Sequence, residues 1–245
     1  MKIIGFLGQA LMVWMCMVAL ALELDVIQLQ YKLLFVIFCV GSGTLVATFG
    51  AGALIIRYAQ DKYVPTDFVL LLVVCFCPAA LTLYVFGIKG LLAPPLNDIS
   101  TDIVNPPALT YAAATRTHIH QPVEFPSHTS ALQTAAYPDI KPFHVPLPAR
   151  DADSLSLYVG TLLGWSIVYD NLAKGDINLQ EKTRFLAFKS DIAIRVTPVD
   201  EDYSIIDIRS AAMEVEWDFG SNAERIRAFV AKFGTELEKR RSTEI

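Results

Sequence analysis

Hydrophobic residues are distributed differently on the two sides of residue 93. Before it, charged residues are few, and three long apolar runs cover residues 3–22, 33–56 and 68–92. Each run reaches the roughly 20 residues that an α-helix needs to cross the hydrocarbon core of a membrane. From about residue 150 onwards, apolar and charged positions alternate as in a water-soluble domain. The pattern predicts three parts, which are a three-helix transmembrane anchor (1–93), a connecting segment (94–148) and a soluble domain (149–245).

The periodicity of the soluble part predicts a helix, an antiparallel meander and a second helix. Apolar residues recur at helical spacing over residues 154–163 and again over residues 223–240. The expected N-caps are Asp153 or Ser154 for the first helix and Ser221 or Asn222 for the second. Alternating apolar and polar residues predict strands at residues 165–169, 177–188, 191–198 and 203–215. This order is typical of an α+β fold, a small antiparallel-sheet domain with flanking helices on one face.

The second apolar run carries small residues on one face. Gly43, Ala47, Gly50 and Ala51 fall together at helical spacing, and small side chains let two helices in lipid approach closely. We expect this face to pack against the other apolar runs of the same chain. The first run is longer than the apolar core of a signal peptide, so we expect it to be retained as an anchor.

Basic residues beside the apolar runs predict the orientation of the anchor. With the N-terminus in the cytoplasm, Lys2, Arg57 and Lys62 lie inside, whereas Lys32 and Lys89 lie outside. The excess on the inside follows the positive-inside rule. We therefore expect an integral membrane protein in contact with membrane lipid. In a bacterium this would be the inner membrane, with the C-terminal domain in the periplasm.

The amino-acid composition of the chain argues against some classes of function. The chain is 53% hydrophobic and only 18% charged, against about 25% charged residues in an average soluble domain. Its net charge is -5, and no stripe of basic residues alternates with aromatic ones, which argues against nucleic-acid binding. All four cysteines lie in the apolar part. The soluble part therefore has neither a disulfide framework nor thiolate chemistry.

The connecting segment, residues 94–148, contains ten prolines and all four histidines. Proline lacks an amide donor and disfavours both helix and sheet, so we expect an extended ordered loop or linker. His118 and His120 would point the same way from an extended chain, as a chelating pair does. Histidines are nevertheless common in polar loops, and no cysteine lies nearby. We therefore predict no metal site and no cofactor.

Turn-forming polar side chains mark the start of the connecting segment. Asp98, Ser100, Thr101 and Asp102 carry oxygens that can bind nearby backbone amides. We therefore predict that residues 98–102 dock onto the soluble domain instead of forming a free linker.

A second group of polar residues lies in and after the last predicted strands: Asp191, Arg195, Arg209, Ser210, Asp218, Asn222 and Arg225. Arg195 and Arg209 fall on strands expected to be adjacent, and two arginines on one sheet face repel unless acids or an anionic ligand separate them. Asp191 and Asp218 are the expected internal partners. The group is thus either a paired structural network or an anion or polar-ligand site. The sequence has no phosphate-binding loop, GxSxG or HExxH motif, so we assign no catalytic residue.

Several motifs occur in a fixed order: NDISTD (97–102), NPP (105–107), YPDI (137–140), GW (164–165), FLAFKSD (185–191), IRV (194–196), DIRS (207–210) and DFGSNAERI (218–226). Through them the chain resembles DUF1499, a family defined by a domain of unknown function, over residues 94–237. One departure concerns residues 209–214, which read RSAAME where the family has Arg-Ser-x-Ser-Arg, so the second basic residue is lost. The resemblance implies an extracytoplasmic domain, often membrane-anchored or exported, without an established reaction.

Two functions fit these observations. The first is a membrane-anchored, extracytoplasmic accessory protein that binds or assembles a membrane-protein partner or a lipid-linked ligand. The alternative is an enzyme that acts on a lipid or cell-envelope precursor, with Asp98 or Asp102 beside Asp218 and Arg209 as its carboxylate and arginine site. A pocket holding a carboxylate with a raised pKa would favour the enzyme.

Overall fold

The computed structural model describes residues 87–171, 175–182 and 188–243, with isolated residues between 41 and 84. The chain divides into two compact units, residues 1–91 and 92–245. Every described residue of the first unit is helical. Among the described residues, no helix combines the length and the apolarity needed to cross a membrane.

The three predicted spans lie largely outside the described residues. This also holds for two members of the small-residue face, Gly43 and Ala47. The other two, Gly50 and Ala51, are helical and half-buried.

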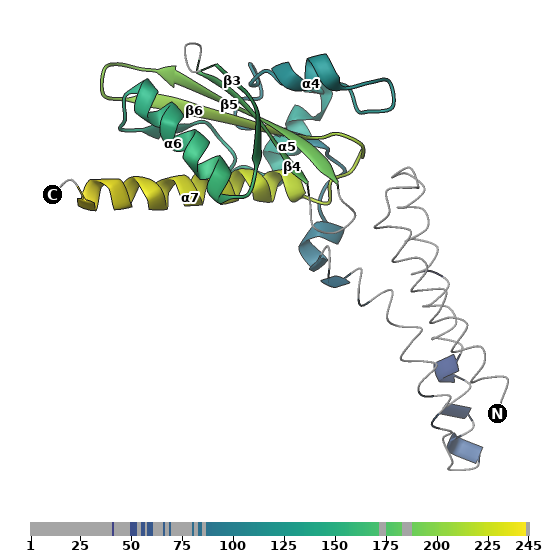
Figure 1. Ribbon diagram of the computed structural model, residues 1–245. Helices are drawn as coiled ribbons and strands as arrows, with labels where there is room; N and C mark the ends of the chain where they lie inside the picture. Colours follow the sequence, from purple (N-terminus) through teal and green to yellow (C-terminus); the bar gives the residue numbers. More distant parts are fainter. Residues whose placement is uncertain are drawn as a thin grey trace. The chain divides into compact units, whose positions relative to one another are not determined.

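One six-stranded antiparallel sheet organises the second unit (Figure 1), in the order β1-β6-β5-β4-β3, with β2 also paired to β6. The strands are β1 (Asp98–Ser100), β2 (Phe143–Val145), β3 (Ser166–Asn171), β4 (Asp176–Lys182), β5 (Lys189–Pro198) and β6 (Ser204–Ala212). The helices are α4 (Thr110–Thr115), α5 (Ser130–Ala136), α6 (Ala149–Leu162) and α7 (Ser221–Thr243), and a 3-10 turn covers Ser127–Thr129. Helix α6 packs on β3, β4 and β5, and α7 packs on β6 and β1. The predicted α+β order of helix, meander and helix is confirmed.

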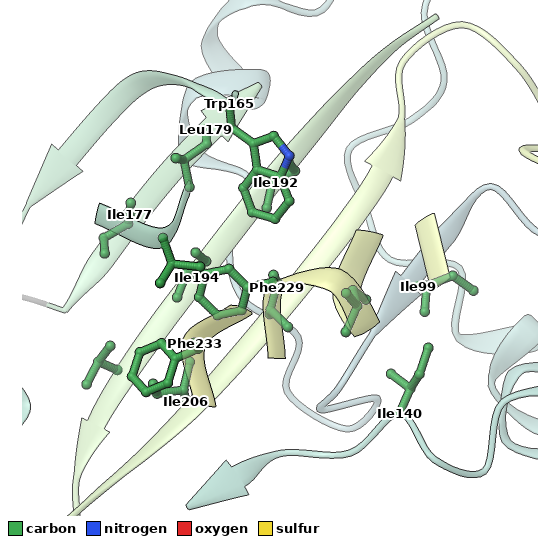
Figure 2. Packing of buried hydrophobic residues seen from close by; sticks show 14 of the residues in the cluster. Ile99, Ile140, Trp165, Ile177, Leu179, Ile192, Ile194, Ile206, Phe229 and Phe233 are labelled. Atoms are coloured by element: carbon green, nitrogen blue, oxygen red, sulfur yellow. The ribbon is translucent and has the colours of Figure 1, made fainter. Parts of the chain in front are cut away.

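The core lies between the sheet and the two long helices (Figure 2). Alternate residues of the central strands point into it, such as Ile192 and Ile194 of β5. Helix α7 contributes Phe229 and Phe233, which are 0% and 1% exposed. Phe229 also stacks on Trp165, with ring centroids 5.8 Å apart. Because burial of each large apolar side chain is worth about 1.5–3 kcal/mol, this layer is the main source of hydrophobic stabilisation in the unit.

Helix α6 begins earlier than the sequence predicts. It starts at Ala149, directly after Pro148, and the fixed backbone angle of proline suits a helix start. The predicted caps, Asp153 and Ser154, therefore lie inside the helix. Asp153 is only 3% exposed there, so the prediction mistook a buried acid for a cap.

Residues 109–123 of the proline-rich segment cover the sheet face away from α6 and α7. Leu109, Ala112 and Val123 pack there against Ala193 of β5 and Ala211 of β6. Where the sequence predicted extended loop, the segment holds five short elements: β1, α4, the 3-10 turn, α5 and β2. Its prolines all fall between these elements, so they end short helices and strands without preventing them.

Candidate functional site

Strand alternation brings the predicted arginines to one face of the sheet. Arg195 of β5 lies opposite Asp207 of β6, and Ala193 lies opposite Arg209. Because Ile194, the residue between Ala193 and Arg195, points into the core, these four residues point to the other face, under the proline-rich segment. As predicted, Arg195 and Arg209 lie on adjacent strands and share a face.

A buried ion pair joins Arg209 to Asp98 of β1. The Nε and Nη2 atoms of Arg209 donate to the two Asp98 carboxylate oxygens at 3.0 and 2.7 Å, and the side chains are only 4% and 5% exposed. Arg209 also donates to the backbone oxygens of Pro107 and Val123. Burial raises the pKa of Asp98, while the Arg209 hydrogen bond acts in the opposite direction. Asp98 is thus the partner of Arg209, and the prediction of Asp191 or Asp218 in this role is wrong.

Asp191 binds a different arginine, Arg116, which follows α4. Arg116 Nε donates to Asp191 at 2.8 Å, both side chains are 3% exposed, and Gln180 donates to the second carboxylate oxygen at 2.7 Å. Asp98 and Asp191 face Ala211 from its two neighbouring strands. Arg116 donates to the Ala211 oxygen, so a small residue leaves room for the guanidinium group between the two acids. No sequence pattern pointed to Arg116 or Gln180.

Arg195 is held by two acids at the more exposed end of this face. Its Nη2 atom donates to Asp102 at 2.9 Å and to Asp207 at 2.8 Å. The Arg195 side chain is 24% exposed. Although burial acts the other way, backbone hydrogen bonds and the Arg195 guanidinium group hold the pKa of Asp102 below its usual value. Thr101 completes the group by donating to Asp207 at 3.3 Å.

Residues 98–102 dock onto the sheet, as predicted. Strand β1 pairs with β6 in an antiparallel register that sets Ser100 opposite Arg209. The backbone of Ser100 also exchanges two hydrogen bonds with the Gln133 side chain of α5, at 3.1 and 2.6 Å. This segment is therefore an edge strand of the fold.

The first turn of α7 is capped by Asp218, which corrects the predicted caps Ser221 and Asn222. The two Asp218 carboxylate oxygens accept the backbone N–H groups of Gly220 and Asn222, both at 2.8 Å. An acid at this position also interacts favourably with the positive end of the helix dipole. Burial nevertheless raises the pKa of Asp218 to about 6.

The remaining predicted residues lie on the helix side of the sheet. Ser210 donates to Asn222 at 2.8 Å, and Arg225 donates to Ser210 at 2.9 Å. Arg225 also forms an ion pair with Glu181 at the end of β4. These contacts fasten α7 to β4 and β6. They form a group separate from the one around Arg209, because α7 covers the opposite face.

The structure therefore favours the paired network over an anion site. Asp98 and Asp102 each accept hydrogen bonds from an arginine, and Asp218 accepts them from backbone amides. The three carboxylates considered for the enzymatic alternative thus have partners within the fold. Such buried pairs fix the relative positions of the elements that carry them.

Candidate metal ligands are scattered over the described part of the chain. No three His, Cys, Asp or Glu side chains there lie close enough together to hold a metal ion. Of the predicted histidine pair, His120 accepts the backbone N–H of Thr117 at 2.9 Å. That hydrogen bond occupies one of its two ring nitrogens.

A family model matches the part of the chain that carries these motifs. The chain matches the family described as "Protein of unknown function (DUF1499)" over residues 98–233, which is more than half of its length. The chain belongs to this family. The resemblance noted from its motifs is thereby confirmed. A comparison with curated proteins found no match. The DUF1499 region runs from β1 to the middle of α7, so it includes both ion-pair groups.

Four buried polar atoms of the DUF1499 chain have no hydrogen-bond partner among the described residues: Tyr137 Oη, Asp153 Oδ1, Ser156 Oγ and Trp217 Nε1. Two of them belong to one turn of α6. Burial raises the pKa of Asp153 to about 6, and the nearby negative charge of Asp170 acts in the same direction. Asp153 therefore destabilises the fold when it is ionised.

We expect Asp153→Asn to stabilise the unit at neutral pH. The pKa is 3.8 ordinarily and about 6 in the folded chain, so the folded state binds the proton more tightly. The native chain thus loses stability as pH rises from about 4 through about 6, and the loss persists above that. Removing the charge should raise the free energy of unfolding by about 1–3 kcal/mol at pH 7.5 and should leave it unchanged near pH 4. Urea unfolding at several pH values measures this difference.

Asp151→Asn provides the control for this experiment. Asp151 lies on the same helix and is exposed, so its replacement should change the free energy of unfolding by a few tenths of a kcal/mol at most. A pH-independent effect of Asp153→Asn would contradict the assignment of a raised pKa to this residue.

Proposed function

We propose that this DUF1499 chain is a membrane-anchored accessory protein. Its C-terminal unit lies on the extracytoplasmic side and binds a membrane-protein partner or a lipid-linked ligand. One observation carries this proposal: the charged residues of the candidate site are paired with each other. The Arg116 and Arg209 side chains are 3% and 4% exposed, whereas a site for an anionic substrate would direct a guanidinium group towards solvent.

The pairing supports a binding role over a catalytic one. The two ion pairs join segments that are far apart in the sequence, so they make the sheet and its covering segment one rigid body. A rigid body recognises a partner through its surface, with little loss of conformational entropy on binding. The three predicted apolar spans support the membrane location of this surface.

Purification of the full chain from native membranes in a mild detergent tests the proposal. Mass spectrometry then identifies the proteins and lipids that stay bound. We expect a membrane protein in a fixed ratio to the chain, or a lipid-linked compound enriched over the bulk lipid. Residues 1–93 alone serve as the control, because they retain the apolar runs and lack the C-terminal unit. A monomer that carries only bulk lipid, or a companion retained equally by the control, would contradict a binding role of the C-terminal unit.

A further inference from the structure

The turn before α7 places two aromatic side chains together at the surface. We name residues 217–220 the aromatic turn. Trp217 and Phe219 stack with ring centroids 4.2 Å apart and 27° between the ring planes, and both are partly exposed. The indole nitrogen of Trp217 donates to no acceptor within the described residues. No hydrogen bond of the described fold therefore requires a tryptophan at this position.

The backbone of the aromatic turn is unfavourable for the residue it carries. Phe219 has a φ of 55° and is the one non-glycine residue with a positive φ in the described part of the chain. This left-handed conformation costs roughly 1–2 kcal/mol for most residues and much less for glycine or asparagine. Phenylalanine thus occupies this position against its backbone preference, and its ring stacks on Trp217.

The aromatic turn is fastened to the chain that follows the third apolar run. The Asp218 N–H donates to the Leu96 oxygen at 3.0 Å, and a Cβ added at Gly220 would lie 3.3 Å from the Ala93 side chain. The apolar run ends at Leu92. Because an extended chain spans at most about 3.6 Å per residue, Leu96 lies within about 14 Å of Leu92.

We propose that the aromatic turn and Leu92 contact the headgroup layer of the membrane. This rests on the proposed anchor, because it takes the run that ends at Leu92 as a membrane span. The chain length then lets the turn reach the layer of about 5–8 Å between hydrocarbon and water. Tryptophan is enriched in that layer, where its ring suits the mixture of apolar and polar groups.

Apolar contact, not charge, holds this surface to lipid. Leu92 is 79% exposed. The charged residues nearest in sequence are Glu214 and Glu216 before the turn and Lys89 before Leu92. With two acids and one lysine, this surface has no excess of positive charge to attract anionic headgroups. The contact should therefore form on zwitterionic phosphatidylcholine and should not weaken in salt.

Fluorescence quenching in vesicles tests the proposal on the full chain. The chain has three tryptophans, Trp14, Trp165 and Trp217. Trp165 is 5% exposed in the core and gives a constant background, whereas Trp14 lies in the first apolar run and reports the anchor. The protein is reconstituted into phosphatidylcholine vesicles with bromine at shallow or deep acyl positions, which quenches nearby indole rings.

We expect Trp14→Phe to retain quenching by the shallow label, and the double variant Trp14→Phe/Trp217→Phe to lose it. Adding about 0.5 M salt, which screens charges beyond a few ångströms, should leave the quenching unchanged. Phe219→Asn in the Trp14→Phe background should keep the fold, because asparagine tolerates the left-handed backbone, and should reduce the shallow quenching.

The two proposals fail in different ways. Suppose that Trp217→Phe is quenched by the deep label while Trp14→Phe is quenched by neither label. The anchor then stands, and the contact of the aromatic turn with lipid is refuted. If neither variant is quenched at either depth, the chain is not in the bilayer, and the proposed anchor fails together with this contact.

Discussion

We expect Arg209→Met to lower the free energy of unfolding by about 3–5 kcal/mol, because it leaves a buried carboxylate without its partner. Asp98 would keep its place on β1, where its side chain is 5% exposed, but would lose both of its hydrogen bonds from Arg209. The backbone oxygens of Pro107 and Val123 would lose a donor as well. Urea unfolding of the detergent-solubilised full chain in the background Trp14→Phe/Trp217→Phe, followed by the fluorescence of the remaining Trp165, measures the loss.

Arg227→Met is the matched control for this substitution. Arg227 also forms a bidentate pair, with Asp139 at 2.6 and 2.8 Å, but its side chain is 35% exposed, so its loss should cost less than about 1 kcal/mol. The double variant Asp98→Leu/Arg209→Met removes both charges and should regain much of the stability. If it is as unstable as Arg209→Met, the shape of the arginine matters more than the unpaired charge.

Truncating the centre of the apolar core should have an effect of similar size. Phe229→Ala is expected to cost about 3–5 kcal/mol, since it removes a fully buried ring and leaves a cavity. Phe229 is 0% exposed and contacts the rings of Trp165, Phe143 and Phe233. The substitution removes three aromatic contacts at once. The same unfolding experiment measures the cost, read from circular dichroism because Trp165 itself loses a neighbour.

The next residue of α7 gives the control. Val230 is 37% exposed, and alanine is the better helix former, so Val230→Ala should change stability by less than about 1 kcal/mol. Equal losses for Val230→Ala and Phe229→Ala would mean that α7 does not bury the face that Figure 2 shows against the sheet.

The main elements could be predicted because their patterns are local. Ile206 and Ile208 alternate with polar residues, which identifies a strand with one buried face. The elements of the proline-rich segment could not be predicted in this way. They are three to seven residues long, too short to show a period, and contacts with the sheet stabilise them.

Several residues of the candidate site were predictable from the sequence, but Arg116 and the pairing of the charges were not. Alternation along β5 and β6 was enough to place Arg195 and Arg209 on one face. Their partners come from elsewhere in the chain: Arg116 and Asp191 are 75 residues apart. No local sequence pattern predicts a contact between residues that are so far apart in the sequence. The only sequence signal for Arg116 was its isolation, because it is a single arginine after an alanine-rich stretch with few basic neighbours. That signal is weak.

The pairing of β1 with β6 bears on when the chain can fold. The ion pair across these strands joins residues 111 positions apart, so the unit has a high contact order and folds only after both strands are available. During synthesis the ribosome releases β1 first and β6 last among the six strands. Until β6 emerges, β1 and β2 have no strand to pair with, although β3, β4 and β5 can already pair with one another. The edge of the sheet that carries β1 and β2 can therefore form only after the last strand has been made.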